Sequence, residues 1–239
     1  MHITNVATRL AFYLLGVTLL GAGWSARASA QVPVPTASTP TLQGGTPITG
    51  MAVGGQIGYA ALRGDFFYGH GKWDLNVSAG IPTFGNNNLP GYNQDVGFDL
   101  RVPFRIHLLE TGIMSGSLKV GPQFNVGRAH RWCGGGDCGT NVGTGVIVGF
   151  VMDFALPKLF KIIGGIEQQL GMTGWHDDGY DNNFFYGATW MDVGLEAFWR
   201  DSIFFTLIMN IGAQYGSDEL YRNDHALFRQ LFGAGYKFK

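Results

Sequence analysis

The sequence predicts an all-β protein that crosses a membrane, an up-and-down antiparallel transmembrane β-barrel of eight strands with ten as the alternative. Three observations support this prediction. Apolar and polar residues alternate in segment after segment, Gly makes up 38 of the 239 residues, and charged residues make up only 14%. Ordinary soluble domains contain about 25% charged residues and about 7% Gly. Few charges and many glycines suit a sheet with lipid on one side and a crowded interior on the other.

The clearest strand lies at residues 95–107. Side chains alternate there with a period of two, so successive residues point to opposite faces of a β-strand. The apolar face carries Val96, Phe98, Leu100, Val102, Phe104 and Ile106. The polar face carries Asp95, Asp99, Arg101, Arg105 and His107. Because this pattern recurs down the chain, we expect apolar faces to contact lipid and charged faces to line the lumen.

Seven further segments alternate in the same way. They lie at residues 73–81, 114–126, 142–154, 162–173, 191–200, 203–215 and 228–238. Gln168 falls on the apolar face of its segment, which indicates a bulge or a position at the membrane interface. Residues 51–62 also alternate. This segment either is not a wall strand or has a partner at residues 46–50 or 65–68, and a partner would raise the count to ten.

The connections between these strands differ in length. Short ones lie near Glu110, Pro157 and Asp201, whereas long polar ones span residues 83–94, 129–141, 176–187 and 216–226. Outer-membrane barrels combine short periplasmic turns with longer external loops. We therefore expect the long loops to face outward and the C-terminus to face the periplasm.

The first 50 residues are predicted to precede the barrel domain, which we place at residues 51–239. Arg9, an apolar run at residues 10–23 and the small residues Ala28 and Ala30 indicate a secretory signal peptide over residues 1–30. An anchoring helix is the alternative, but the run is shorter than the ~20 residues that a span needs. Residues 31–50 are rich in Pro and Thr, so we expect a flexible leader.

Cys133 and Cys138 are the two cysteines of the chain, and Gly-Gly-Gly-Asp separates them in a predicted loop. In an exported protein this spacing favours a disulfide that closes a small ring. The alternatives are free thiols, or metal ligation together with His130, for which no fourth ligand is evident.

The predicted inner faces carry equal numbers of acids and bases. The acids are Asp74, Asp99, Asp153, Glu167, Asp192 and Glu196, and the bases are Arg101, Arg105, Lys119, Arg200, Arg229 and Lys237. Side chains just fill a barrel of eight strands, and buried ions need partners. We therefore expect a paired polar plug. A polar pore or gated channel is the alternative, and ten or more strands would favour it.

No residue of the chain is assigned a catalytic, cofactor-binding or metal-binding role. The histidines after the signal peptide are His70, His107, His130, His176 and His225, and none stands in a convincing Ser/His/Asp spacing. Residues 176–183 offer oxygen ligands for Ca²⁺, but their composition is also that of a turn-forming loop. A net charge of -1 gives no basic footprint, so nucleic acid is not an expected partner.

The last residues resemble the assembly signal of bacterial outer-membrane β-barrel proteins, in which a Gly precedes two aromatic residues by three and five positions. Gly233, Tyr236 and Phe238 match it, and Lys239 extends beyond the usual aromatic end. Aromatic residues near strand ends fit the interfacial girdles of such barrels. They are Trp73, Phe104, Trp175, Trp190, Trp199, Tyr215, Tyr236 and Phe238.

The resemblance is to small barrels of the OmpA-like class, and it implies a monomer in the outer membrane of a Gram-negative bacterium. The implied partners are outer-membrane lipids, lipopolysaccharide and the barrel assembly machinery. A structural role or a small, porin-like polar pore is expected. A lipid-modifying enzyme, such as a lipid A deacylase or a phospholipase, is an alternative. A soluble lipid-binding barrel is another, and it would turn the apolar faces inward.

Overall fold

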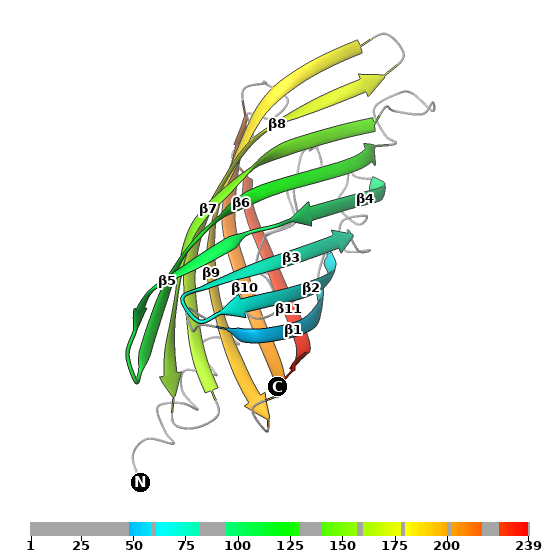
Figure 1. Ribbon diagram of the computed structural model, residues 1–239. Helices are drawn as coiled ribbons and strands as arrows, with labels where there is room; N and C mark the ends of the chain where they lie inside the picture. Colours follow the sequence, from blue (N-terminus) through cyan, green and yellow to red (C-terminus); the bar gives the residue numbers. More distant parts are fainter. Residues whose placement is uncertain are drawn as a thin grey trace.

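The computed structural model describes residues 48–58, 61–81, 94–129, 140–156, 160–177, 180–199, 202–216 and 225–238. These residues form one closed antiparallel sheet (Figure 1). Its strands are β1 (Thr49–Gly58), β2 (Ala61–His70), β3 (Trp73–Ile81), β4 (Gln94–Arg101), β5 (Phe104–Glu110), β6 (Met114–Ala129), β7 (Thr140–Leu156), β8 (Phe160–Asp177), β9 (Tyr180–Trp199), β10 (Ile203–Gly216) and β11 (His225–Lys237).

The sheet closes because β1 pairs with both β2 and β11. The predicted up-and-down antiparallel barrel is therefore confirmed. The preferred count of eight strands is wrong, and the wall has the ten positions of the alternative. β1 and β2 are the two additional strands. Residues 51–58 therefore belong to a wall strand, and its partner β2 includes residues 65–68. The sequence hides β2 because Phe67 is apolar and yet faces the lumen, fully buried, so the alternation of this segment is broken.

β4 and β5 occupy one position of the wall, between β3 and β6. Both halves keep the same register with each neighbour, so they are one strand interrupted at residues 102–103. The peptide nitrogen of Val102 donates to Pro122 (3.1 Å), and that of Asn76 donates to Pro103 (2.9 Å). Neither proline can donate in return, because proline has no N–H. The predicted continuous strand at residues 95–107 is thus split by two missing ladder bonds.

The wall is strongly staggered. A row of directly opposed residues begins at Lys161 on β8 and passes Gln56 on β1 and Asp99 on β4. The row returns to β8 at Thr173, 12 residues further along the strand. With strands about 4.8 Å apart and a rise of about 3.3 Å per residue, this stagger gives a tilt of about 40° and a backbone radius of about 10 Å. A lumen of this width needs many large side chains to fill it.

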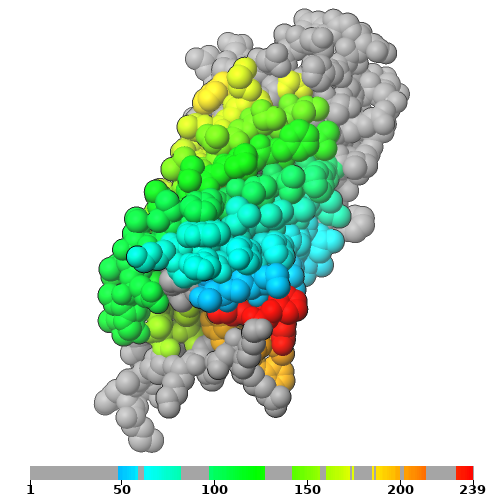
Figure 2. Space-filling model, in the orientation of Figure 1, coloured from blue at the N-terminus to red at the C-terminus, as the bar shows by residue number. Residues whose placement is uncertain are grey.

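The two faces of the wall differ in chemistry. Phe98 is 39% exposed and Val148 is 45% exposed on the outside, whereas Asp99 and Arg101 are buried inside. β1 to β6 form a continuous outer wall (Figure 2). A soluble lipid-binding barrel requires the opposite arrangement, so the structure contradicts that alternative. No helix in the described ranges is long and apolar enough to cross a membrane.

One predicted long loop is instead an extended hairpin. β8 and β9 stay paired as far as Asp177 and Tyr180, so most of residues 176–187 are strand. This hairpin projects at the end of the barrel away from the C-terminus (Figure 1). We call the end that holds the C-terminus the short-turn end. The side chains of the calcium candidate at residues 176–183, and Cys133, Cys138 and His130, lie outside the described part of the chain.

Gln168 faces outward within an unbroken ladder, so the bulge interpretation is wrong. Its polar atoms are bonded locally instead. The Thr189 hydroxyl donates to Gln168 Oε1 (2.7 Å), and Gln168 Nε2 donates to the Ala188 carbonyl (3.2 Å). The amide is thereby satisfied on an otherwise apolar face.

Candidate functional site

The inner face of the barrel holds most of the charged side chains singled out from the sequence. Those that are buried are Asp74, Asp99, Arg101, Arg105, Lys119, Asp153, Glu167, Asp192 and Glu196. Lys237 is half-buried, and the side chains of Arg200 and Arg229 lie outside the described part of the chain. The structure adds Arg63 and Asp65, which were missed because β2 was not counted, and Lys161, which stands at the very start of its strand.

Five of these residues form what we call the central cluster: Arg63, Asp99, Arg101, Lys119 and Glu167. Glu167 is its hub. Lys119 Nζ lies 2.5 Å from Glu167 Oε2, and Arg101 Nη1 lies 3.4 Å from Glu167 Oε1. Arg101 Nε also lies 3.2 Å from Asp99 Oδ2, and Arg63 Nη2 lies 3.5 Å from the same oxygen. The cluster therefore joins three cations and two anions without interruption.

The central cluster crosses the lumen. Arg101 is on β4 and Glu167 is on β8, and β6 and β7 lie between these strands in the wall. Neutral side chains complete the polar contacts. Gln169 Nε2 donates to Glu167 Oε1 (2.7 Å), and Arg63 Nη2 donates to Ser78 Oγ (2.7 Å). Because the five side chains are almost completely buried, each charge depends on its partners rather than on bulk water.

A second group, which we call the wall pair group, consists of Asp74, Arg105 and His107. Asp74 and Arg105 face each other across β3 and β5. Arg105 Nε donates to Asp74 Oδ1 (2.6 Å) and Nη2 donates to Oδ2 (2.9 Å), a bidentate geometry. His107 Nε2 lies 2.7 Å from Asp74 Oδ2. All three side chains come from neighbouring strands on one side of the lumen.

Two smaller polar contacts line the opposite side. Asn210 Nδ2 donates to Asp192 Oδ1 (2.6 Å) between directly opposed residues of β10 and β9. Lys161 Nζ lies 3.6 Å from Asp153 Oδ2 and 5.2 Å from the centre of the Phe198 ring. Polar contacts therefore occur on both sides of the lumen.

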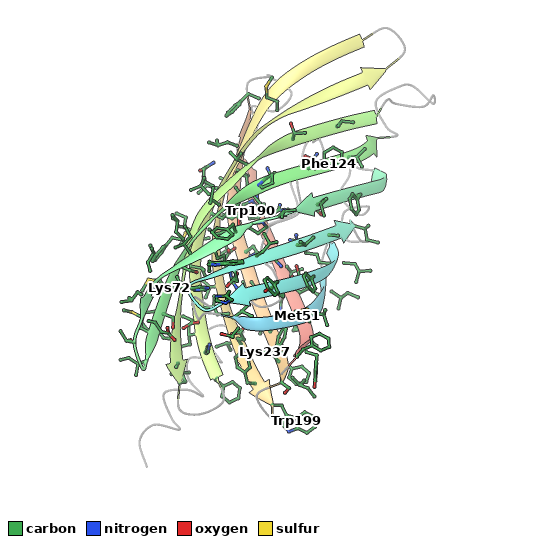
Figure 3. All side chains as sticks on the ribbon, viewed as in Figure 1. Met51, Lys72, Phe124, Trp190, Trp199 and Lys237 are labelled. Atoms are coloured by element: carbon green, nitrogen blue, oxygen red, sulfur yellow. The ribbon has the colours of Figure 1, made fainter. Side chains whose placement is uncertain are left out.

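Trp190 was predicted to belong to the interfacial aromatic girdle, and this prediction is wrong. It is fully buried inside the lumen, about midway along the barrel, whereas Trp199 is 56% exposed at the short-turn end (Figure 3). Gly212 makes room for the indole, since a Cβ there would lie 2.5 Å from Trp190 Cε3. Trp73 and Phe104 stack at 5.4 Å on the outer face. The side chains of Trp175 and Tyr215 lie outside the described part of the chain.

The residues of the assembly signal divide between the two faces. Gly233 faces the lumen between Gln56 and Thr206, its opposed partners on β1 and β10. Tyr236 and Phe238 are each 44% exposed on the outside, with ring centres 5.2 Å apart. An inward glycine followed by two outward aromatics is the arrangement that the spacing of three and five residues gives on a strand.

The structure also juxtaposes a serine, a histidine and an aspartate that the sequence did not suggest. Ser117 directly opposes His107, which in turn contacts Asp74. However, Ser117 is fully buried, and its Oγ has no hydrogen-bond partner among the described residues. A nucleophile must lie within hydrogen-bond reach of its base, so this geometry does not support an activated serine. No metal-binding group of acids, histidines and cysteines occurs among the described residues.

Comparisons with known proteins give distant structural likenesses alone. No family model and no curated protein matches the chain. Among solved structures, it is similar to the outer membrane protease OmpT from Escherichia coli (TM-score 0.42, 8% identity, 81% of this chain and 94% of that one). It is also similar to the KdgM porin (0.36, 10%, 79% and 99%). A third is the N-terminal β-barrel domain of Pseudomonas aeruginosa OprF (0.32, 12%, 79% and 95%). Their names describe a protease, a porin and a β-barrel domain.

Proposed function

We propose that this chain is an integral protein of a bacterial outer membrane whose barrel spans the bilayer with an occluded lumen. Its role is structural, or that of a narrow polar pathway that is closed in the described state. The observation that supports this proposal most directly is the division of the wall into an apolar outer face and a charged inner face.

The outer face is unsuited to water. Large apolar side chains at least 36% exposed occur on every strand from β1 to β11, among them Ile57, Ile166 and Phe232. An apolar surface that encircles a protein marks a membrane or an interface. In hydrocarbon every backbone group needs an internal partner, and a closed barrel provides one for nearly all of them.

The inner face supports occlusion. The central cluster spans the lumen, and its charged groups are bonded to one another rather than lining an open channel. A polar pore remains the second candidate because of one observation. A backbone radius of about 10 Å leaves room for a passage if these ion pairs separate.

The membrane assignment is tested with the full chain expressed in a bacterium with two membranes. We expect the protein to fractionate with the outer membrane, to resist alkaline carbonate extraction, and to migrate differently in SDS gels before and after boiling. A monomer that is soluble without detergent would overturn the assignment.

Replacing Ile166 by Arg provides a quantitative test of the outer face. Ile166 is 52% exposed and lies midway along β8. An Arg near the bilayer midplane lowers the free energy of unfolding by about 2–4 kcal/mol in lipid vesicles. Ile166→Leu is the matched control and should leave urea unfolding unchanged. An arginine variant as stable as the parent would place Ile166 outside the bilayer.

The expected partners follow from the same placement. Outer-membrane lipids and lipopolysaccharide would contact the outer face, and the assembly machinery would recognise the strand that carries Gly233, Tyr236 and Phe238. The disulfide between Cys133 and Cys138 remains a prediction. Comparing gel mobility with and without reductant tests it directly.

A further inference from the structure

The lumen contains an apolar cluster in addition to its polar groups. Ile48, Ala52, Phe67 and Phe204 are each no more than 3% exposed and pack together, with Phe198 against them. These residues lie toward the short-turn end, where β1 begins, β9 ends and β10 begins. The rings of Phe198 and Phe204 are 6.3 Å apart. We call this cluster the apolar closure.

Glycines at three places make the apolar closure fit. A Cβ on Gly235 would lie 2.2 Å from Phe204 Cζ, so only glycine leaves space for that ring. A Cβ on Gly69 would lie 2.0 Å from the Ile48 carbonyl oxygen. Gly50, the second residue of β1, has a φ of 85°, a left-handed conformation that glycine adopts readily. The start of the described chain is thereby packed into the end of the lumen.

The apolar closure and the central cluster lie at different heights. Thr206 follows Phe204 by two residues on β10, so it faces the lumen one step further from the short-turn end. Its hydroxyl is buried and has no hydrogen-bond partner among the described residues. The central cluster lies beyond Thr206. Lys161, Glu196 and Thr206 are directly opposed across β8, β9 and β10, and Glu167 lies six residues further along β8 from the short-turn end.

We propose that the barrel is closed twice in series, by an apolar constriction near the short-turn end, to which β1, β2, β9 and β10 contribute, and by ion pairs at mid-height. This inference rests on the proposed membrane-spanning function. The two closures resist ions by different means. Apolar constrictions exclude water, whereas the central cluster obstructs the lumen with side chains bound to one another. Opening one closure leaves the other intact, so ions pass only when both are open.

Thr206 provides a reporter between the closures. A Thr206→Cys variant in a Cys133→Ser, Cys138→Ser background is purified in detergent and treated with a charged, water-soluble methanethiosulfonate. With both closures intact we expect slow labelling. Adding Phe204→Ala opens the short-turn side, and adding Glu167→Gln loosens the central cluster. Each should speed labelling by about tenfold or more, which corresponds to 1.4 kcal/mol.

Phe205→Ala is the matched control, because Phe205 is the same residue type on the same strand but is 47% exposed on the outer face. It should leave the labelling rate unchanged. Phe67→Ser, which alters the apolar closure from β2, replaces Phe204→Ala if that variant loses its heat-modifiable mobility in SDS gels.

Conductance in planar bilayers completes the test. Phe204→Ala and Glu167→Gln should each remain at the parental level, whereas the double variant should conduct. Rapid labelling of the parent, or conduction by either folded single variant, overturns closure in series. Failure of the parent to insert into membranes is a separate result that overturns the proposed function instead.

Discussion

The central cluster and the wall pair group differ in how far apart in the wall the strands lie that they connect. Both bury charges in the lumen, yet the wall pair group joins residues of two adjacent strands, whereas the central cluster joins β2, β4, β6 and β8. The first is an extension of strand pairing. The central cluster can form only once the sheet has curled far enough to bring β2 and β4 close to β6 and β8.

This difference separates the roles of the two groups. The wall pair group fixes neighbouring strands and leaves the cross-section of the lumen unchanged. The central cluster ties distant walls together and obstructs the passage between them. Variants of the central cluster should therefore affect both stability and labelling of the Thr206→Cys reporter, whereas variants of the wall pair group should affect stability alone.

The largest effect is expected from Glu167→Gln. Glu167 neutralises both Lys119 and Arg101, so the substitution leaves two buried cations with one anion fewer. Removing one partner of a buried ion pair costs about 3–5 kcal/mol. We expect that loss in the free energy of unfolding, measured by urea titration in lipid vesicles. Glu110→Gln, at an exposed carboxylate next to the β5–β6 turn, is the control. An equal loss of unfolding free energy in both variants would show that Glu167 contributes no more to stability than an exposed carboxylate.

A smaller effect is expected from Asp74→Asn. The amide oxygen can still accept from Arg105, but the charge and one half of the bidentate contact are lost. Hydrogen bonds to charged groups contribute about 1.5–3 kcal/mol each. We expect a loss of that size, with labelling of the Thr206→Cys reporter unchanged. Faster labelling would show that the wall pair group also closes the lumen, and the comparison would then fail.

Much of the fold could be predicted because the two faces of most strands differ so clearly. Residues 73–81 alternate without exception in polarity and became β3, and residues 142–154, which became β7, alternate except at Thr144, Ile147 and Val151. β2 was missed since Phe67 puts an aromatic ring on the lumen side. The end of the β8–β9 hairpin was predicted to be a loop because it contains several Asp, Asn and Gly residues, which favour turns.

The lumen was harder to predict than the wall. Alternation indicates which residues point inward, and it placed Asp99, Arg101 and Glu167 on that face. It contains no information on which inward residues meet across the barrel, since that depends on strand number and stagger. The apolar closure was unforeseen for the same reason. Trp190 was assigned to the aromatic girdle, whereas the structure buries it in the lumen. Alternation places Phe204 on the same face as Thr206, but it does not show which residues pack against the ring.

The smallest effect is expected where the two groups meet. Arg101 belongs to the central cluster and Arg105 to the wall pair group, and Pro103 lies between them on the same inward face. Pro103→Val restores an N–H that can donate to the Asn76 carbonyl, so it should raise the free energy of unfolding by about 0.5–1.5 kcal/mol. Pro122→Val, which restores the donor opposite Val102, should act similarly. Amide hydrogen exchange at Asn76 and Val102 should slow in both variants if the prolines weaken this part of the wall. Unchanged exchange would mean that the two missing hydrogen bonds do not weaken the wall at residues 102–103. β4 and β5 would then behave as one continuous strand that supports Arg101 and Arg105 equally.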